Sequence, residues 1–224
     1  MNKKVVWNAD RTVGPREAFT EAQIDSLLDY LMRKQDWHDL AMFSTGFDTM
    51  LRGVDLLALR VRDVQTPTGN IRPYLYRKQQ KAKRGVQLVL TDLSRNALAV
   101  WIEASGKRPE DFLFTRRKDV HGPPISSSAF RLAIKQRARD IGLDSTDISG
   151  HSLRRSKAIS MYDRGCPIAD ISKLLGHKDI ATTMHYLGIT DAHLRAQAVK
   201  YDIFSTDKKR RMQQILDRHT RGKI

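Results

Sequence analysis

The chain has 224 residues, of which 40 are Lys or Arg and 25 are Asp or Glu, so its formal net charge is +15. This length excludes a long multidomain machine but allows one large domain or two small ones with a sizeable core. The charge favours a polyanionic partner, with nucleic acid ahead of an acidic membrane surface.

The first 18 or so residues are polar and are predicted to form an N-terminal arm. Thr20 and Gln23 then form a capping-box pattern that predicts the start of a helix. Apolar residues follow at helical spacing, at Ile24, Leu27, Leu28 and Leu31. A second helix is expected over residues 36–50.

The next segment, residues 53–59, is predicted to be a short helix that leads into a β segment at Val61 and Val64. Residues 71–76 and 86–90 have a β-like pattern, with Val86, Leu88 and Leu90 alternating on one face. The basic residues 78–85 between them predict a hairpin tip.

The remainder of the chain is predicted to be helical. The expected helices cover residues 92–104, 126–141, 151–164, 167–175, 179–187, 191–202 and 206–219. No internal repeat or low-complexity linker divides the sequence. The predicted fold class is therefore α+β: a mainly helical domain with a small antiparallel sheet.

Three short motifs concentrate chemistry near the C-terminal end. His151 and Arg154 stand three residues apart at the start of a predicted helix, so both side chains lie on one face and can bind one phosphate. Gly176 is suited to end a helix in the left-handed conformation and to place His177 in a turn. Tyr186 follows nine residues after His177.

The spacing of His177 and Tyr186 limits how they can meet. In one continuous helix they would lie on opposite sides and about 13.5 Å apart along the axis. A site that contains both residues therefore requires a bend after His177, or a tyrosine supplied by a neighbouring subunit.

These motifs resemble the tyrosine recombinase (phage integrase) family. H-x-L-R-R at residues 151–155, L-G-H at 175–177 and a tyrosine nine residues later stand in the family's order and spacing. Residues 45–56 resemble the family's first arginine box, with Arg52 followed by Asp55 and Leu56. The resemblance covers roughly residues 19–190, which we expect to form the catalytic domain.

The resemblance implies an enzyme that cleaves and rejoins double-stranded DNA without a metal or a cofactor. Arg52 and Arg154 would neutralise the scissile phosphate, Tyr186 would attack it, and His151 would accept the tyrosine's proton. His177 would hydrogen-bond the phosphate. A hairpin lysine would protonate the leaving 5′ oxygen.

The identity of that lysine stays open at the sequence level. Lys83 fits the family position best, and Lys81 is the alternative. In the family a second histidine commonly follows the second arginine, whereas this chain has Arg155. Cys166 carries no predicted chemistry, and a single cysteine excludes an intrachain disulfide framework.

The first arginine box begins near residue 45, so we expect no separate N-terminal core-binding domain, as in the short recombinases that invert fimbrial promoters. Residues 191–224 are predicted to form a basic helical tail, which includes Lys208, Lys209, Arg210 and Arg211. This tail is expected to be a solvated helix, or to grip DNA or dock on a neighbouring subunit.

The expected partners are double-stranded DNA, further copies of the chain as a dimer to tetramer, and a host recombinase or accessory protein. The N-terminal sequence MNKKVVWNAD lacks a signal-peptide core, and no run of 18 apolar residues occurs. We therefore expect no membrane insertion and a location in the bacterial cytoplasm or nucleoid.

Two other functional classes stay open. A type IB topoisomerase or telomere resolvase would use similar residues, and a DNA-binding regulator or accessory factor would keep the site without using it. The sequence does not distinguish integration, inversion and resolution of mobile DNA as the biological role.

Overall fold

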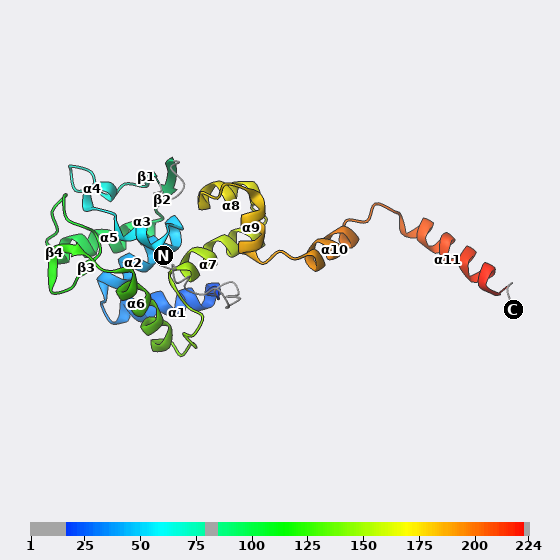
Figure 1. The fold of residues 1–224 in the computed structure, drawn as a ribbon, viewed down its shortest axis with the longest axis horizontal. Coiled ribbons are helices and arrows are strands. Elements are labelled where there is room, and N and C mark those ends of the chain that lie inside the picture. Colours follow the sequence, from blue (N-terminus) through cyan, green and yellow to red (C-terminus); the bar gives the residue numbers. More distant parts are fainter. Residues whose placement is uncertain (1–16, 79–84, 222–224) are drawn as a thin grey trace, which may run out of the picture. The chain divides into compact units, whose positions relative to one another are not determined.

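The computed structural model describes residues 17–78 and 85–221. They divide into two compact units, one extending to Gly188 and one beginning at Ile189 (Figure 1). Lys81 and Lys83, the two candidates for the hairpin lysine, lie outside the described residues.

The first unit is built around helix α2. Helix α1, Glu21–Arg33, begins with the predicted capping box, in which the Thr20 hydroxyl accepts from the Gln23 backbone. Helix α2, Trp37–Thr49, is buried along almost its whole length because it packs against α1, α5 and α7. It ends at Met50 in the left-handed conformation, with φ of 48°.

Two short helices follow, and one of them corrects a sequence prediction. Helix α3, Gly53–Leu57, was expected, but Val61–Val64 form helix α4 and not a β segment. The Asp63 carboxylate accepts from the Arg60 backbone N–H at 2.8 Å, so it caps this turn. Val61 and Val64 are buried in the helical turn. Apolar residues are needed in a buried turn as well as in a buried strand, so their apolar character alone does not distinguish the two.

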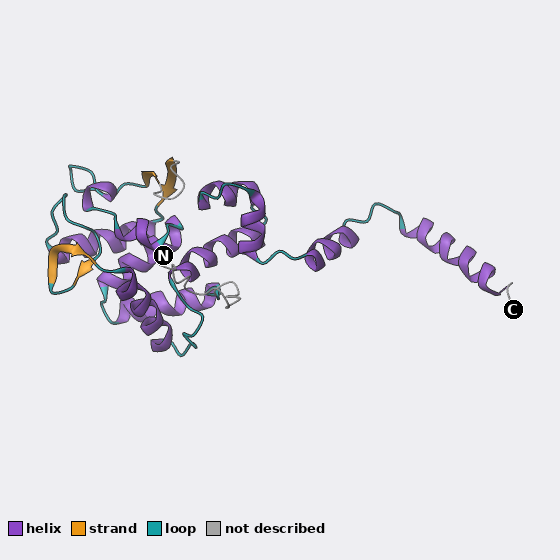
Figure 2. Ribbon diagram, in the orientation of Figure 1, coloured by secondary structure: helices purple, strands orange, loops and turns teal. Residues whose placement is uncertain are grey.

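The strands form two separate antiparallel pairs (Figure 2). Strand β1, Tyr74–Lys78, pairs with β2, Gly85–Val89, close to the predicted ranges. Leu88 and Leu90 are buried, as their alternation predicted. Strands β3, Thr115–Arg116, and β4, Asp119–Pro124, were not predicted, because the first has two residues and the second contains Gly-Pro-Pro.

Five further helices complete the first unit: α5 Asp92–Ser105, α6 Ser127–Asp140, α7 Gly150–Asp163, α8 Ile168–Leu175 and α9 Ile180–Leu187. The predicted fold class, mainly helical with small antiparallel sheets, is confirmed. The main core includes Phe43 and Phe114, both fully buried. A smaller cluster of Met50, Ala158, Ile171 and Leu175 joins α8 to α7 and to the end of α2.

The second unit consists of α10, Asp191–Lys200, and α11, Thr206–Arg221. Its large apolar side chains are exposed; they are Leu194, Val199, Tyr201, Ile203, Phe204, Met212, Ile215 and Leu216. Among the described residues, no helix is both long enough and apolar enough to cross a membrane.

Candidate active site

The first turn of α7 presents the predicted His151 and Arg154. Ser149 caps this helix: its hydroxyl accepts from the His151 backbone N–H at 3.3 Å, and its own N–H donates to Ser152 at 2.9 Å. His151 is exposed at the end of the helix, whereas Arg154, one turn on, is only 2% exposed. The two residues therefore share a face at different depths.

The Arg154 guanidinium connects the C-terminal ends of two helices. Nη1 donates to the carbonyl of Met50 at the end of α2, and Nη2 donates to the carbonyl of Leu175 at the end of α8. Burial lowers the pKa of Arg154 to about 10, and the charge of Arg52 acts in the same direction. Tyr186 and, less strongly, the buried Asp55 carboxylate oppose this effect and raise the pKa of Arg154.

The left-handed turn at Met50 leads directly to Arg52, which is half-buried at the N-cap of α3. Arg52, His151 and Arg154 line one pocket of about 270 Å³. Ser127 and Arg131 of α6 border the same pocket. The arrangement places arginines from three segments, Arg52, Arg131 and Arg154, around a space that an anion can enter.

The chain bends between α8 and α9. Gly176 ends α8 in the left-handed conformation, with φ of 62°, and the Asp179 side chain caps α9. Because the helices are separate, the His177 and Tyr186 rings of the same chain meet edge to face, with centroids 5.5 Å apart. Of the two arrangements that the spacing allowed, this structure has the bend.

The His177 ring contacts the buried hydroxyl of Thr183. Its Nδ1 lies 2.9 Å from Oγ1 of Thr183, which is fully buried in α9. The pKa of His177 is lowered to about 4, mainly by burial and also by the positive charges of Arg154 and Arg52. The negative charge of Asp179 acts in the opposite direction but is the smallest of these effects. The imidazole is therefore neutral at pH 7.

The Tyr186 hydroxyl is directed at α7, where it donates to the His151 backbone carbonyl at 3.2 Å. Burial raises the pKa of Tyr186 to about 12, although Arg154, Arg155 and Arg52 act in the opposite direction. In this state the phenol keeps its proton at neutral pH.

The structure thus brings five of the six predicted site residues into one region: Arg52, His151, Arg154, His177 and Tyr186. The sixth, Lys83 or its alternative Lys81, is outside the described residues. Strand β2, which follows this segment, packs against α8, and its Gln87 shares a pocket of about 490 Å³ with His177.

Two supporting residues had no role in the sequence interpretation. Thr183 contacts His177, but a threonine six residues after a histidine is not a pattern that indicates such a contact in the sequence. The Met50 carbonyl accepts from Arg154, and a backbone acceptor has no side-chain signature in the sequence.

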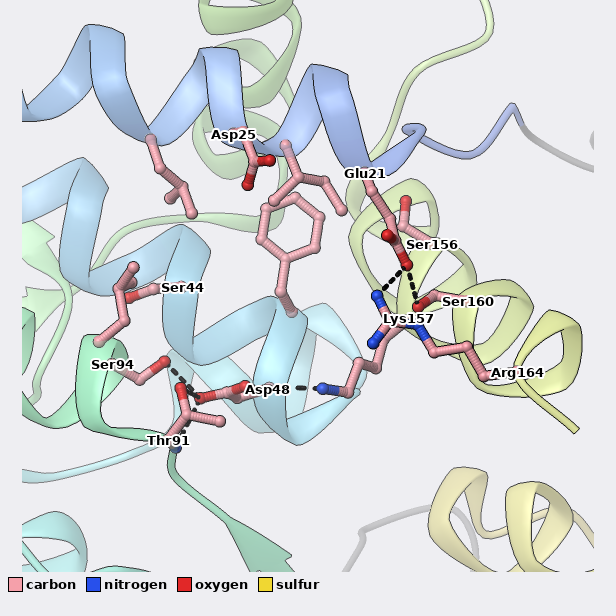
Figure 3. A pocket seen from close by; sticks show the side chains of 14 residues that line it. Glu21, Asp25, Ser44, Asp48, Thr91, Ser94, Ser156, Lys157, Ser160 and Arg164 are labelled. Carbon is pink, nitrogen blue, oxygen red and sulfur yellow. Dashed lines mark hydrogen bonds and ion pairs between the residues drawn. The ribbon is translucent and has the colours of Figure 1, made fainter. Parts of the chain in front are cut away.

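A different pocket, of about 340 Å³, lies between α1, α2, α5 and α7 (Figure 3). None of the predicted site residues lines it. Two of its acidic side chains form ion pairs: Glu21 with Arg164 at 2.7 Å, and Asp48 with Lys157 at 3.9 Å. These pairs connect α7 to α1 and α2.

Fold and site together define a mainly helical domain in which Arg52, His151 and Arg154 line one pocket and His177 packs against Tyr186. Residues 17–193 match the phage integrase family, and the chain belongs to this family. The resemblance read from the motifs is confirmed.

Curated relatives include tyrosine recombinase XerC of Herpetosiphon aurantiacus, which is 30% identical over 196 residues, or 83% of this chain and 59% of the relative. The probable integrase/recombinase YoeC of Bacillus subtilis is 27% identical over 176 residues, or 78% of this chain and 90% of the relative. The chain spans 54–59% of the length of the first XerC and recombinase relatives that it matches.

Solved structures support the fold. The crystal structure of XerA recombinase superposes with a TM-score of 0.67 at 19% identity, over 87% of this chain and 66% of the other. XerH bound to its difH substrate superposes with a TM-score of 0.65 at 17% identity, over 89% of this chain and 58% of the other.

Proposed function

We propose that this chain is a site-specific recombinase that cleaves and rejoins double-stranded DNA through Tyr186. The observation that carries the proposal is the meeting of Arg154, His177 and Tyr186 beside the pocket that Arg52 and His151 line. Family membership adds support, because these residues occupy the family's motif positions.

In the proposed reaction, a phosphodiester enters the pocket and Arg52 and Arg154 neutralise its nonbridging oxygens. Guanidinium groups suit this task because they form paired hydrogen bonds in a fixed geometry and stay charged. Charge on those oxygens grows in the transition state, so the two arginines stabilise it more than the ground state.

The covalent step exchanges one phosphate ester for another. The Tyr186 oxygen bonds to phosphorus, the bond to the 5′ oxygen breaks, and a 3′-phosphotyrosyl link forms. The phenol proton passes to His151, and Lys83, or Lys81 in its place, protonates the 5′ oxygen. Attack by a 5′ hydroxyl reverses these transfers, so strand exchange consumes no nucleotide and requires no cofactor.

His177 acts in this scheme as a neutral hydrogen-bond donor. If the Thr183 hydroxyl donates to Nδ1, the single ring proton resides on Nε2, which is free to donate to the phosphate. The pKa of about 4 supports this role, because a neutral ring keeps that tautomer throughout the physiological range.

The resting contact of Tyr186 fits an enzyme that waits for its substrate. With a pKa of about 12, the phenol is a poor nucleophile while it donates to the His151 carbonyl. In the proposed mechanism, binding of the DNA phosphate draws the hydroxyl from this carbonyl toward phosphorus, where His151 accepts its proton.

We further propose that the chain assembles on DNA as a dimer to tetramer, because exchange between two duplexes requires four cleavages. The exposed apolar side chains of the second unit supply contact area for another subunit. A host recombinase or accessory protein would complete the complex. The site of action would be the bacterial cytoplasm or nucleoid, and the outcome would be integration, inversion or resolution of mobile DNA.

The test uses a pool of duplexes with randomised sequence and a nick, which traps a cleaved strand as a covalent adduct. The full chain should form a denaturant-resistant protein–DNA adduct that disappears in Tyr186→Phe. Tyr162→Phe is the matched control, because Tyr162 packs partly buried against the small cluster on α7. Sequencing the trapped DNA should yield paired inverted half-sites.

Other outcomes would overturn the proposal. Binding to specific sequences without an adduct would indicate a DNA-binding regulator. Adducts that only relax supercoiled DNA and never exchange strands would indicate a type IB topoisomerase activity.

A further inference from the structure

Arg155 departs from the family's motif, and its side chain lies near the nucleophile's helix. It follows Arg154 on α7, is half-buried, and its Nε atom is buried. A Cβ built on Gly188 would lie 3.4 Å from Nη2 of Arg155. Gly188 ends α9 two residues after Tyr186, so the Arg155 guanidinium is adjacent to the end of this helix.

The end of α9 is a favourable place for a cation. Gly188 has φ of 78° and its N–H donates to carbonyls of the preceding turn, which closes the helix. The last carbonyls of a helix carry partial negative charge, and a guanidinium near them is stabilising. Because Gly188 has no side chain, the Arg155 guanidinium can approach the backbone there.

The same turn of α7 receives the nucleophile. The Tyr186 hydroxyl donates to the carbonyl of His151, which is one helical turn before Arg155. Helices α7 and α9 pack against each other. Two neighbouring groups of α7, the Arg155 guanidinium and the His151 carbonyl, are therefore close to the segment that carries Tyr186.

We propose that Arg155 is a positioning residue for Tyr186, which fixes the end of α9 against α7 and supplies a positive charge to the nucleophile. The charge of Arg155 also lowers the pKa of Tyr186 against the effect of burial. The inference rests on the proposed function, since it assigns Arg155 to the nucleophile of that reaction. It differs from a phosphate contact, because it predicts an effect in the absence of DNA.

The first test measures Tyr186 without DNA. The full chain carries 3-fluorotyrosine at position 186, whose more acidic phenol is titrated by fluorine NMR. Loss of a nearby positive charge should raise the phenol pKa, so Arg155→Ala should move the midpoint up by about one pH unit. Arg155→Lys should recover most of this change, and Arg164→Ala, an exposed arginine on the same helix, should leave the midpoint unchanged.

The second test measures adduct formation on the nicked duplex pool at saturating protein. Arg155→Ala should slow formation of the covalent adduct by up to about tenfold, the factor by which one unit of phenol pKa changes the phenolate fraction, with DNA affinity within about threefold of the parent. Arg155→Lys should be intermediate. Thermal melting shows whether Arg155→Ala is folded. If it is not, Arg155→Lys is compared with the parent in its place.

The outcomes separate the two proposals. A parent protein that forms no adduct while Arg155→Ala still moves the fluorine titration would overturn the recombinase function and leave the Arg155–Tyr186 coupling intact. A parent that forms the adduct while Arg155→Ala matches it in both rate and midpoint would overturn the inference alone. A large loss of DNA affinity with an unchanged midpoint would also overturn it, because Arg155 would then be a phosphate contact.

Discussion

The edge of one ring meets the face of the other where His177 and Tyr186 pack together, with 5.5 Å between centroids and 83° between planes. Nine residues of continuous helix would separate them by about 13.5 Å along its axis. The left-handed turn at Gly176 and the Asp179 cap break the helix, and the contact follows from this break.

His177 should be neutral in the folded protein well below pH 6.5. Burial, together with Arg154 and Arg52, lowers its pKa to about 4. Since the unfolded chain binds a proton here near pH 6.5 and the folded chain does not, this residue's contribution to stability is complete above pH 6.5 and is lost as the pH falls toward 4. Long-range proton–nitrogen NMR should show a neutral ring with Nε2 protonated at pH 6.

The variant His177→Gln assigns the NMR signals and removes this part of the pH dependence of unfolding. Thr183→Val removes the hydroxyl next to Nδ1 and should mix the two tautomers. A charged His177 ring at pH 6 in the parent protein would contradict the prediction.

Sequence patterns with short-range causes predicted the structure well. The Thr20–Gln23 capping box and the glycine at position 176 act within one turn, and both helix boundaries lie where they indicated. The apolar alternation around Leu88 also identified a strand correctly. Where apolar spacing was ambiguous, at Val61 and Val64, the capping contact of Asp63 decided for helix.

Features that depend on distant segments could not be predicted. The depth of Arg154 depends on carbonyls of Met50 and Leu175, which lie 104 and 21 residues away in the sequence. The motif identified the arginine, but only the fold reveals that it also holds helix ends together. The position of Arg155 next to Gly188 has the same origin.

Asp48 should stabilise the start of α5. Its Oδ2 accepts from the Thr91 N–H at 2.8 Å, the Thr91 hydroxyl at 2.7 Å and the Ser94 hydroxyl at 2.5 Å (Figure 3). Hydrogen bonds to a charged group contribute about 1.5–3 kcal/mol each when lost singly, and losses from one network overlap, so Asp48→Ala should cost about 3 kcal/mol in urea unfolding.

Asp25→Ala is the matched control, because Asp25 lines the same pocket but is exposed. It should change the free energy of unfolding by less than about 0.5 kcal/mol. Equal costs for the two variants would show that the contacts of Asp48 are not stabilising.

Asp39 should make the protein sensitive to acid. Burial alone would raise its pKa, but the hydrogen bond from His38 at 2.8 Å, the charges of His38 and Arg117 and the hydrogen bond from Arg137 lower the pKa to about 2. Its contribution to stability is therefore present above pH 4 and is lost as the pH falls toward 2. Asp39→Asn should cost about 2 kcal/mol at pH 7.

The cost of Asp39→Asn should shrink as unfolding is measured at lower pH, because below pH 4 the unfolded parent chain binds a proton at Asp39 that the folded chain, with a pKa of about 2, does not. Asp163→Asn, at the exposed end of α7, serves as the control and should show no such trend. A cost that is constant between pH 7 and pH 3 would indicate that packing, and not charge, makes Asp39 important.

The two arginines of the candidate active site, Arg52 and Arg154, should differ in their effect on folding stability although both should be needed for cleavage. Arg154 is 2% exposed and donates to the carbonyls of Met50 and Leu175, so Arg154→Ala leaves buried acceptors without a donor and should cost about 3 kcal/mol of folding free energy. Arg52 is half-buried at the pocket, and Arg52→Ala should cost at most about 1 kcal/mol.

Under the proposed function, both variants should reduce adduct formation on nicked duplexes by about 100-fold or more, because each removes charge from the developing transition state. Arg164→Ala removes an exposed arginine from α7 and controls for net charge in both measurements. Arg52→Ala gives the clearest test of a catalytic role, because its cleavage rate can be measured in a protein that is nearly as stable as the parent. If Arg52→Ala is folded and cleaves at the parental rate, Arg52 borders the pocket without acting on the phosphate. If Arg154→Ala has the stability of the parent, the two carbonyl contacts of Arg154 do not hold the ends of α2 and α8 together.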